Sequence, residues 1–142
     1  MTTRRGDRGS AAVEMAVLMP LFVVLFSAAI ALGRTAGAIG AVEMAAYDGA
    51  RSASLARDAV AAGAAARQAV ISSLAGQGYA CRGGPEVSVD TDGFAAPVGT
   101  PASVTVRVDC RVSYVDLSVL RLGDRVVSAV FVSPLDRYRG RG

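Results

Sequence analysis

A single carboxylate, that of Glu14, stands at the start of the most apolar part of the sequence. It precedes a run from Met15 to Gly33 that has no charged side chain over nineteen residues. An acidic side chain at the middle of a bilayer costs on the order of 3 kcal/mol on insertion scales, and less near the edge. The simplest interpretation is an acid tolerated at a membrane interface, but so unusual a position also suggests a specific role.

The chain has two cysteines, Cys81 and Cys110. In an exported protein, an even pair separated by a few dozen residues is most simply one disulfide. Two buried free thiols are the alternative, whereas a redox-active pair is disfavoured because the spacing is not C-x-x-C. A disulfide would help to stabilise the small core that the residues beyond the apolar run can form.

No catalytic, cofactor-binding or metal-binding residues are predicted. Histidine is absent from the sequence, which removes the commonest general base and a common metal ligand. The sequence also has no G-x-S-x-G motif and no glycine-rich phosphate loop. Asp90 and Asp92 lie in an Asp-Thr-Asp-Gly stretch typical of a turn; a calcium loop is the alternative, but the other ligands of an EF-hand are missing. We therefore expect a protein that is not an enzyme.

Composition and charge indicate a single-pass membrane protein. Of the 142 residues, 52% are hydrophobic, and the mean hydropathy is +0.41. The apolar run can cross a bilayer, because about 20 apolar residues span roughly 30 Å. Arg4, Arg5 and Arg8 precede it, so the positive-inside rule places the N-terminus in the cytoplasm and the C-terminal part outside. The apolar run makes membrane lipid an expected partner. Nucleic acid is not expected, because the net charge of +3 is spread along the chain and forms no basic patch.

A removed secretory signal is the alternative interpretation of the apolar run. Ala29-Ile30-Ala31 fits a small-x-small cleavage site, and a fully secreted protein, such as an enzyme, would then begin near Leu32. The run is, however, longer than the roughly 7 to 15 apolar residues of such signals.

The stretch Gly9-Ser10-Ala11-Ala12-Val13-Glu14, after a short arginine-rich leader, resembles the processing site of type IV prepilins. In those proteins a dedicated prepilin peptidase cuts after the glycine, and the acid becomes the fifth residue of the mature chain. The resemblance implies cleavage between Gly9 and Ser10. The new α-amino group would be positive at neutral pH, so Glu14 of one subunit could neutralise the amine of its neighbour and act as an assembly contact.

The wider pattern is similar to the TadE-like family of minor pilins, or pseudopilins, of the Flp/Tad tight-adherence (type IVb) pilus system. That family typically shows G-x-x-x-x-E-(F/M)-A, an apolar helix containing proline, a Gly-Arg exit and a later A-x-x-G-A-R segment. The matching residues are RGSAAVEMAVLMPLFVVLF at 8–26, LGR at 32–34 and AAYDGARSASLARD at 45–58. Met15 stands where the family often has Phe, and the C-terminal half is similar only in general character.

This resemblance implies both function and partners. The expected function is a minor pilin-like structural subunit needed for assembly or initiation of a Flp/Tad adherence pilus. The expected partners are a prepilin peptidase, the pilus assembly platform and its ATPase, the major Flp pilin and other minor pilins. The alternative is a signal-anchored extracytoplasmic binding protein that never enters a filament.

Helical signals continue beyond the apolar run, and one helix is expected from Ser10 to about Leu55. Pro20 removes a backbone hydrogen bond inside it and is expected to kink it. Asp48 and Arg51 are expected to pair on an exposed face. Small residues at every fourth position would let another helix approach closely; they are Gly33, Gly37, Ala41, Ala45, Gly49 and Ala53.

A second helix is expected to begin at Asp58, a good N-cap, and to stop at Gly76-Gln77-Gly78. Its predicted apolar stripe consists of Val60, Ala64, Val70, Ile71 and Leu74.

From Glu86 the apolar period changes to two, which indicates strands. A short strand holds Val87 and Val89, a longer one runs from Val104 to Tyr114, and a third runs from Val126 to Val132 after a loop at Gly123-Asp124. They would form an antiparallel sheet whose apolar face is covered by the second helix. The predicted fold class is therefore α+β.

The predicted organisation has five consecutive parts. They are a cytoplasmic leader (1–9), a transmembrane helix (10–33), an exported helical segment with a break near 56–58 (34–75), a disulfide-linked β-sheet region (76–136) and a flexible basic tail (137–142).

Overall fold

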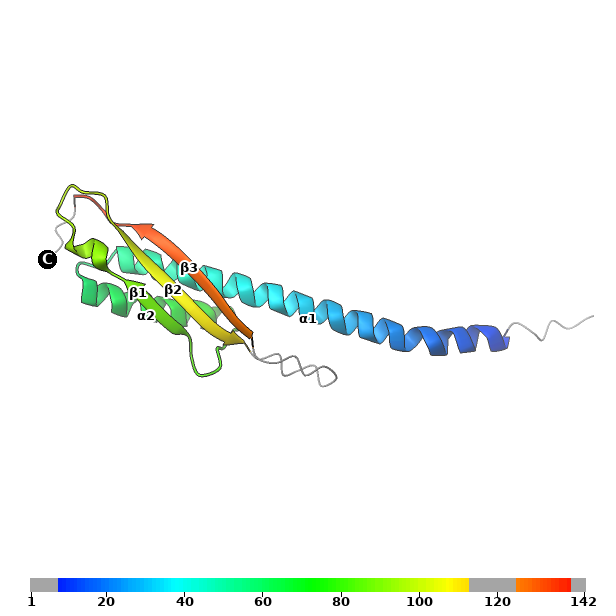
Figure 1. Ribbon diagram of the computed structural model, residues 1–142. Helices are drawn as coiled ribbons and strands as arrows, with labels where there is room; N and C mark the ends of the chain where they lie inside the picture. Colours follow the sequence, from blue (N-terminus) through cyan, green and yellow to red (C-terminus); the bar gives the residue numbers. More distant parts are fainter. Residues whose placement is uncertain (1–7, 113–124, 139–142) are drawn as a thin grey trace, which may run out of the picture. The chain divides into compact units, whose positions relative to one another are not determined.

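The computed structural model describes residues 8–112 and 125–138 (Figure 1). The elements, in chain order, are α1 (Arg8–Ser54), α2 (Ala59–Gly76), β1 (Glu86–Asp90), the 3₁₀ helix η1 (Asp92–Ala95), β2 (Ser103–Val112) and β3 (Arg125–Pro134). The α+β class and the three-stranded antiparallel sheet are confirmed. The chain divides into two compact units, residues 1–35 and 36–142, and the core described next belongs to the second.

The two helices are separated by a short connection that the local sequence specifies. Asp58 has an extended backbone, and its carboxylate accepts a hydrogen bond from the backbone N–H of Ala61 at 2.8 Å. This is the N-cap interaction expected of an aspartate at a helix start. At the other end of α2, the backbone N–H of Tyr79 bonds the carbonyl of Leu74 at 3.0 Å, and Gly78 has a positive φ of 74°. The predicted boundaries of the second helix are therefore confirmed.

The sheet has the order β1-β2-β3, and both pairings are antiparallel. Val104, Val106, Val108 and Cys110 of β2 are buried, whereas their polar neighbours along the strand are half-buried or exposed. This alternation is the period-two pattern of a sheet with one covered face. The predicted positions Tyr114 and Gly123-Asp124 lie outside the described residues.

The covered face of the sheet packs on both helices, as Figure 1 shows. The sequence predicted the second helix alone as the cover, and this was incomplete. The later part of α1 supplies much of the same core, through Ala41, Val42, Ala45, Ala46, Ala50 and Ala53. α2 supplies Ala62, Ala66, Val70 and Leu74. The many alanines are explained by this arrangement, because small side chains allow two helices and a sheet to pack closely.

The predicted apolar stripe of α2 was partly wrong. Val60 is 85% exposed and Ile71 is 51% exposed, and Ala64 is not buried either. The buried residues recur at every fourth position from Ala62 instead. Alanine is so frequent in this helix that hydrophobicity alone does not single out its buried face.

The turn expected at Asp90-Thr91-Asp92-Gly93 is present and continues into η1. The carboxylate of Asp90 accepts a hydrogen bond from the backbone N–H of Asp92 at 3.0 Å, as in an Asx turn. Gly93 is required because a Cβ at that position would overlap the carbonyl of Ser103. The chain thereby crosses closely over the start of β2.

Candidate functional site

The first candidate site is the N-terminal part of α1. From Val13 to Leu32 its large apolar side chains are exposed, and this is the part of the described chain that is long and apolar enough to cross a membrane. A helix that is apolar on all sides and covered by no protein is what a bilayer would solvate. The predicted single membrane-span candidate is thus confirmed, while its orientation stays a prediction.

Two hydroxyl groups, one in this segment and one just after it, have hydrogen-bond partners on their own helix. The hydroxyl of Ser27 donates to the carbonyl of Val23 at 2.7 Å, and that of Thr35 donates to the carbonyl of Ala31 at 2.9 Å. Bonds of this i to i−4 kind allow hydroxyl side chains to lie in hydrocarbon without losing a hydrogen-bond partner. Serine and threonine therefore do not conflict with a membrane location.

The residues predicted for processing and assembly lie at the beginning of the same helix. The backbone at Gly9 and Ser10 is helical, and Glu14 follows about one turn after Ser10 with an exposed side chain. Glu14 therefore lies in the first turns of the helix. If the chain were cut after Gly9, the new α-amino group of Ser10 would lie at the start of the same helix. Pro20 lies inside α1, which is helical on both sides of it; the kink stays a prediction.

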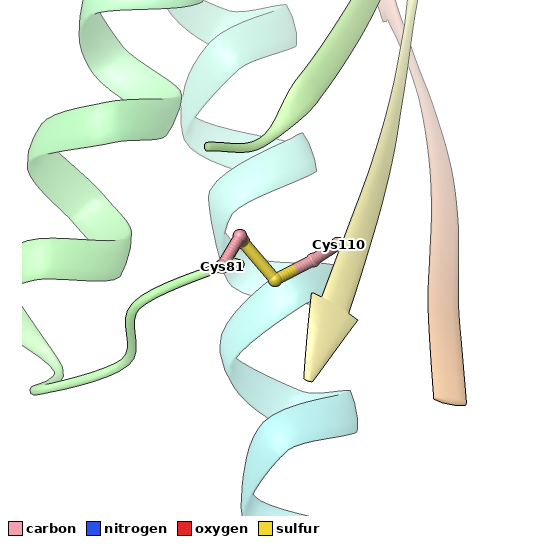
Figure 2. The surroundings of a disulfide bond; sticks show 2 residues. All are labelled: Cys81 and Cys110. Carbon is pink, nitrogen blue, oxygen red and sulfur yellow. A yellow bond between two sulfur atoms is a disulfide. The ribbon is translucent and has the colours of Figure 1, made fainter. Parts of the chain in front are cut away.

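The second candidate site is the disulfide between Cys81 and Cys110, which joins the segment after α2 to β2 near its end (Figure 2). The two Cα atoms are 5.2 Å apart and the cysteines are 29 residues apart in the chain. Cys110 is fully buried, and the backbone N–H of Arg82 bonds the carbonyl of Arg111 at 2.9 Å beside it. The predicted bridge is present and fixes the α2–β1 connection against the central strand.

The sequence did not predict a cluster of polar side chains on the open face of the sheet. Arg107 contacts Asp109 by two hydrogen bonds, Nε to Oδ2 at 2.9 Å and Nη2 to Oδ1 at 3.2 Å. The hydroxyl of Ser128 on β3 also donates to the Asp109 carboxylate. These bonds, first that from Arg107 and then that from Ser128, hold the pKa of Asp109 below its usual value of 3.8. The alternation of β2 placed both charged residues on one face, but the pairing with Ser128 depends on the strand register.

A shallow groove lies between α1 and β3 within the second unit. It is lined by Gly40, Glu43, Met44 and Tyr47 of the helix and by residues 128–131 of the strand. The rings of Tyr47 and Phe131 meet edge to face with centroids 4.8 Å apart, a favourable aromatic geometry. Met44 and Phe131 are both exposed, so this groove is an apolar surface rather than a closed binding pocket.

Within residues 8–112 and 125–138, no three His, Cys, Asp or Glu side chains are close enough to hold a metal ion. The two aspartates considered for calcium, Asp90 and Asp92, take part in the turn already described.

A comparison with known protein families shows which proteins the first site resembles. Residues 9–51 match the family model of TadE-like proteins. This part of the chain is similar to TadE-like proteins. The TadE-like segment begins at Gly9, includes Glu14, Pro20 and the whole apolar run, and ends at Arg51. The resemblance noted from the sequence is confirmed, and it associates the protein with the Tad pilus machinery in general terms.

The TadE-like segment coincides with most of α1, whereas the disulfide and the sheet lie beyond it. A comparison with curated proteins and one with solved structures gave no match.

Proposed function

We propose that this protein is a minor pilin-like structural subunit needed for the assembly or initiation of a Flp/Tad adherence pilus. The observation that carries the proposal is the TadE-like match over residues 9–51, which includes the glycine, the acid and the apolar helix that a pilin requires. The role is non-catalytic. The span holds the subunit in the membrane or in the filament, and the disulfide-linked sheet forms the exported part.

Processing after Gly9 gives the Glu14 carboxylate its function. Cleavage by a prepilin peptidase would expose the α-amino group of Ser10, a cation at neutral pH. In a low-dielectric environment a lone carboxylate is unfavourable, and an ammonium group from the neighbouring subunit compensates it. The contact then favours assembled subunits over isolated ones, and it fixes the axial position of each helix relative to the next.

The N-terminus of the membrane-bound protein tests this proposal. The full chain would be expressed with a prepilin peptidase of a Tad system, purified from membranes and analysed by intact-mass and N-terminal peptide mass spectrometry. We expect Ser10 as the first residue. A Gly9→Leu variant, which changes the residue before the cleavage point, is expected to keep its leader and serves as the control.

Two results would contradict the proposal. An intact leader on the unaltered chain favours a signal-anchored extracytoplasmic binding protein. A mature N-terminus near Leu32 favours a protein released after removal of a secretory signal.

A further inference from the structure

The two outer strands of the sheet have opposite characters. β3 is ten residues long, and after Arg125 it has no charged residue. On the open face of the sheet, Val126, Val130 and Val132 are 57%, 54% and 53% exposed. Its outer edge pairs with no strand among the described residues. Sheet proteins usually protect such an edge with charges or an internal proline, so a long apolar edge indicates a surface that another strand covers.

β1, at the opposite edge, is short and acidic. It has five residues, and Glu86 and Asp90 at its two ends are exposed. Val87 and Val89 between them point to the helix-covered face and pack against the core. β1 therefore offers two carboxylates, four residues apart, on the open face and two valines on the other.

The register of β2 and β3 places two arginines at the matching spacing. Arg111 is paired with Val126, and Arg107 is paired with Val130. Both arginines are exposed on the open face. Arg107 and Arg111 are four residues apart, as are Glu86 and Asp90 of β1.

We propose that β3 of one copy pairs with β1 of a second copy, so that the sheet continues from subunit to subunit. In this register Glu86 of the second copy lies beside Val126, and its Asp90 lies beside Val130. Neighbouring strands are about 4.8 Å apart, so the carboxylates lie roughly 10 Å from β2. An extended arginine and a glutamate together bridge that distance, so Arg111 reaches Glu86 across the intervening Val126.

The covered face of the joined sheet has a matching feature. Val87 and Val89 of the second copy enter on the helix-covered side, next to Val127 and Ala129. The groove bounded by Met44 and Tyr47 lies on that side. Val87 and Val89 are half-buried and keep their place against the core of their own copy. The contact covers what remains exposed of them, and removal of that apolar surface from water favours association.

The polarity of the strands determines the type of assembly. β1 and β3 are each antiparallel to β2, so they run parallel to each other. A second copy that presents β1 to β3 therefore has the same orientation as the first, and each copy leaves one edge open for the next. Such a heterologous contact produces rings or open helical arrays rather than a closed dimer. Its location in a pilus rests on the proposed function, whereas the contact itself does not.

Reversing the charge of one residue on each side of the contact, in separate chains, tests the contact directly. Full-length chains with Arg111→Glu or Glu86→Arg would be purified in detergent, and their self-association would be measured by sedimentation over a range of concentrations. Each single variant is expected to associate roughly tenfold more weakly than the unaltered chain, because like charges then face each other. An equimolar mixture of the two variants is expected to regain association, since the glutamate introduced in one chain then meets the arginine introduced in the other. Arg67→Glu, on the exposed face of α2, serves as the matched control.

Cross-linking tests the register. Ser88 of the second copy is expected beside Ser128, at a Cα distance compatible with a disulfide. A mixture of Ser88→Cys and Ser128→Cys chains should give a cross-linked dimer between the two kinds of chain, and neither variant alone should do so.

Two results would overturn the proposal. One is that the unaltered chain self-associates no more strongly than the Arg111→Glu variant. The other is rescue by the two changes in a single chain but not by the mixture, which would show that the charges act within one copy. Neither result bears on whether the N-terminus is cut before Ser10, so failure of this inference is distinguishable from failure of the proposed function.

Discussion

Gly49 of α1 lies so close to Val70 of α2 that a Cβ on the glycine would be 2.8 Å from the Val70 Cγ2 atom. The same Cβ would be 3.3 Å from Cγ1 of Val106 and 3.4 Å from the carbonyl oxygen of Ala66. The small-residue row of α1 therefore has a packing role within its own subunit, in addition to any role between subunits.

Replacing Gly49 by alanine should destabilise the protein. Alanine gains up to about 1 kcal/mol in helix propensity, but overpacking of a close-packed core costs about 1–3 kcal/mol. We expect a net loss of about 1 kcal/mol, seen as a lower Tm in thermal unfolding followed by circular dichroism. Gly40→Ala is the matched control, because no described atom comes within 4 Å of a Cβ there; it should raise the Tm. Equal effects of the two changes would contradict the packing argument.

The hydrogen bond between Ser73 and Asp48 should contribute to holding the two helices together. The Ser73 hydroxyl donates to Oδ2 of Asp48 at 2.7 Å in a half-buried position, whereas the sequence had suggested Arg51 as the partner of this aspartate. Ser73→Ala should cost about 1–2 kcal/mol in the free energy of unfolding, as is usual for a hydrogen bond to a charged group. Denaturant titration would measure this cost. The neighbouring exposed Ser72→Ala should change it by less than about 0.5 kcal/mol.

Removal of the disulfide should lower stability markedly. A bridge that closes a loop of 29 residues restricts the unfolded chain by about 3–4 kcal/mol in the chain-entropy model. The variant Cys81→Ala/Cys110→Ala should therefore unfold at a much lower temperature than the unaltered chain. A reducing agent should lower the Tm of the unaltered chain and leave that of the variant unchanged. If the reductant had no effect on the unaltered chain, the bridge would not be a stabilising element.

The Asp109 cluster should make stability depend on acidic pH. Because the pKa of Asp109 is lower in the folded protein than its usual 3.8, the ionised group stabilises the fold above that value. This contribution is lost as the pH falls through the folded pKa. The Tm difference between the unaltered chain and Asp109→Asn should thus be largest near neutral pH and shrink below pH 3.8. Ser128→Ala should give a smaller change in the same direction, and a pH-independent difference would contradict the assignment.

Replacement of Glu14 tests the proposed assembly contact. Glu14→Ala and Glu14→Gln remove an acid from an apolar helix, which makes insertion easier by an amount on the order of 3 kcal/mol at most. We therefore expect normal amounts in the membrane fraction and strongly reduced amounts in sheared surface pili. Glu14→Asp, which keeps the charge, should retain part of the assembly. Pili in normal amounts with Glu14→Gln would exclude the carboxylate as an assembly contact.

Several features could be predicted because their causes are local in the chain. The apolar run identifies the membrane-span candidate by length alone. Asp58 marks the start of α2 because its side chain caps the N–H groups of the next turn. The alternation from Val104 to Cys110 identifies the covered face of β2, because successive side chains of a strand point to opposite faces.

The buried face of α2 and the role of α1 in the core were decided only by the tertiary structure. Alanine occurs on every side of these helices, so a buried position such as Ala62 differs from the less buried Ala64 only in what packs against it. Ile71, although more apolar than either, lies on the exposed side. Hydrophobicity has little power to distinguish faces when one residue type fills both.

The polar contacts depend on the fold for the same reason. Asp48 bonds a serine 25 residues away, and Asp109 bonds one that is 19 residues away, so helix packing and strand register select these partners. By itself, the sequence determined the apolar span, the TadE-like motif and the cysteine pair, because each is a matter of residue type and spacing. The tertiary structure decided which surfaces meet and which strand edge stays open, because those depend on contacts between residues far apart in the chain.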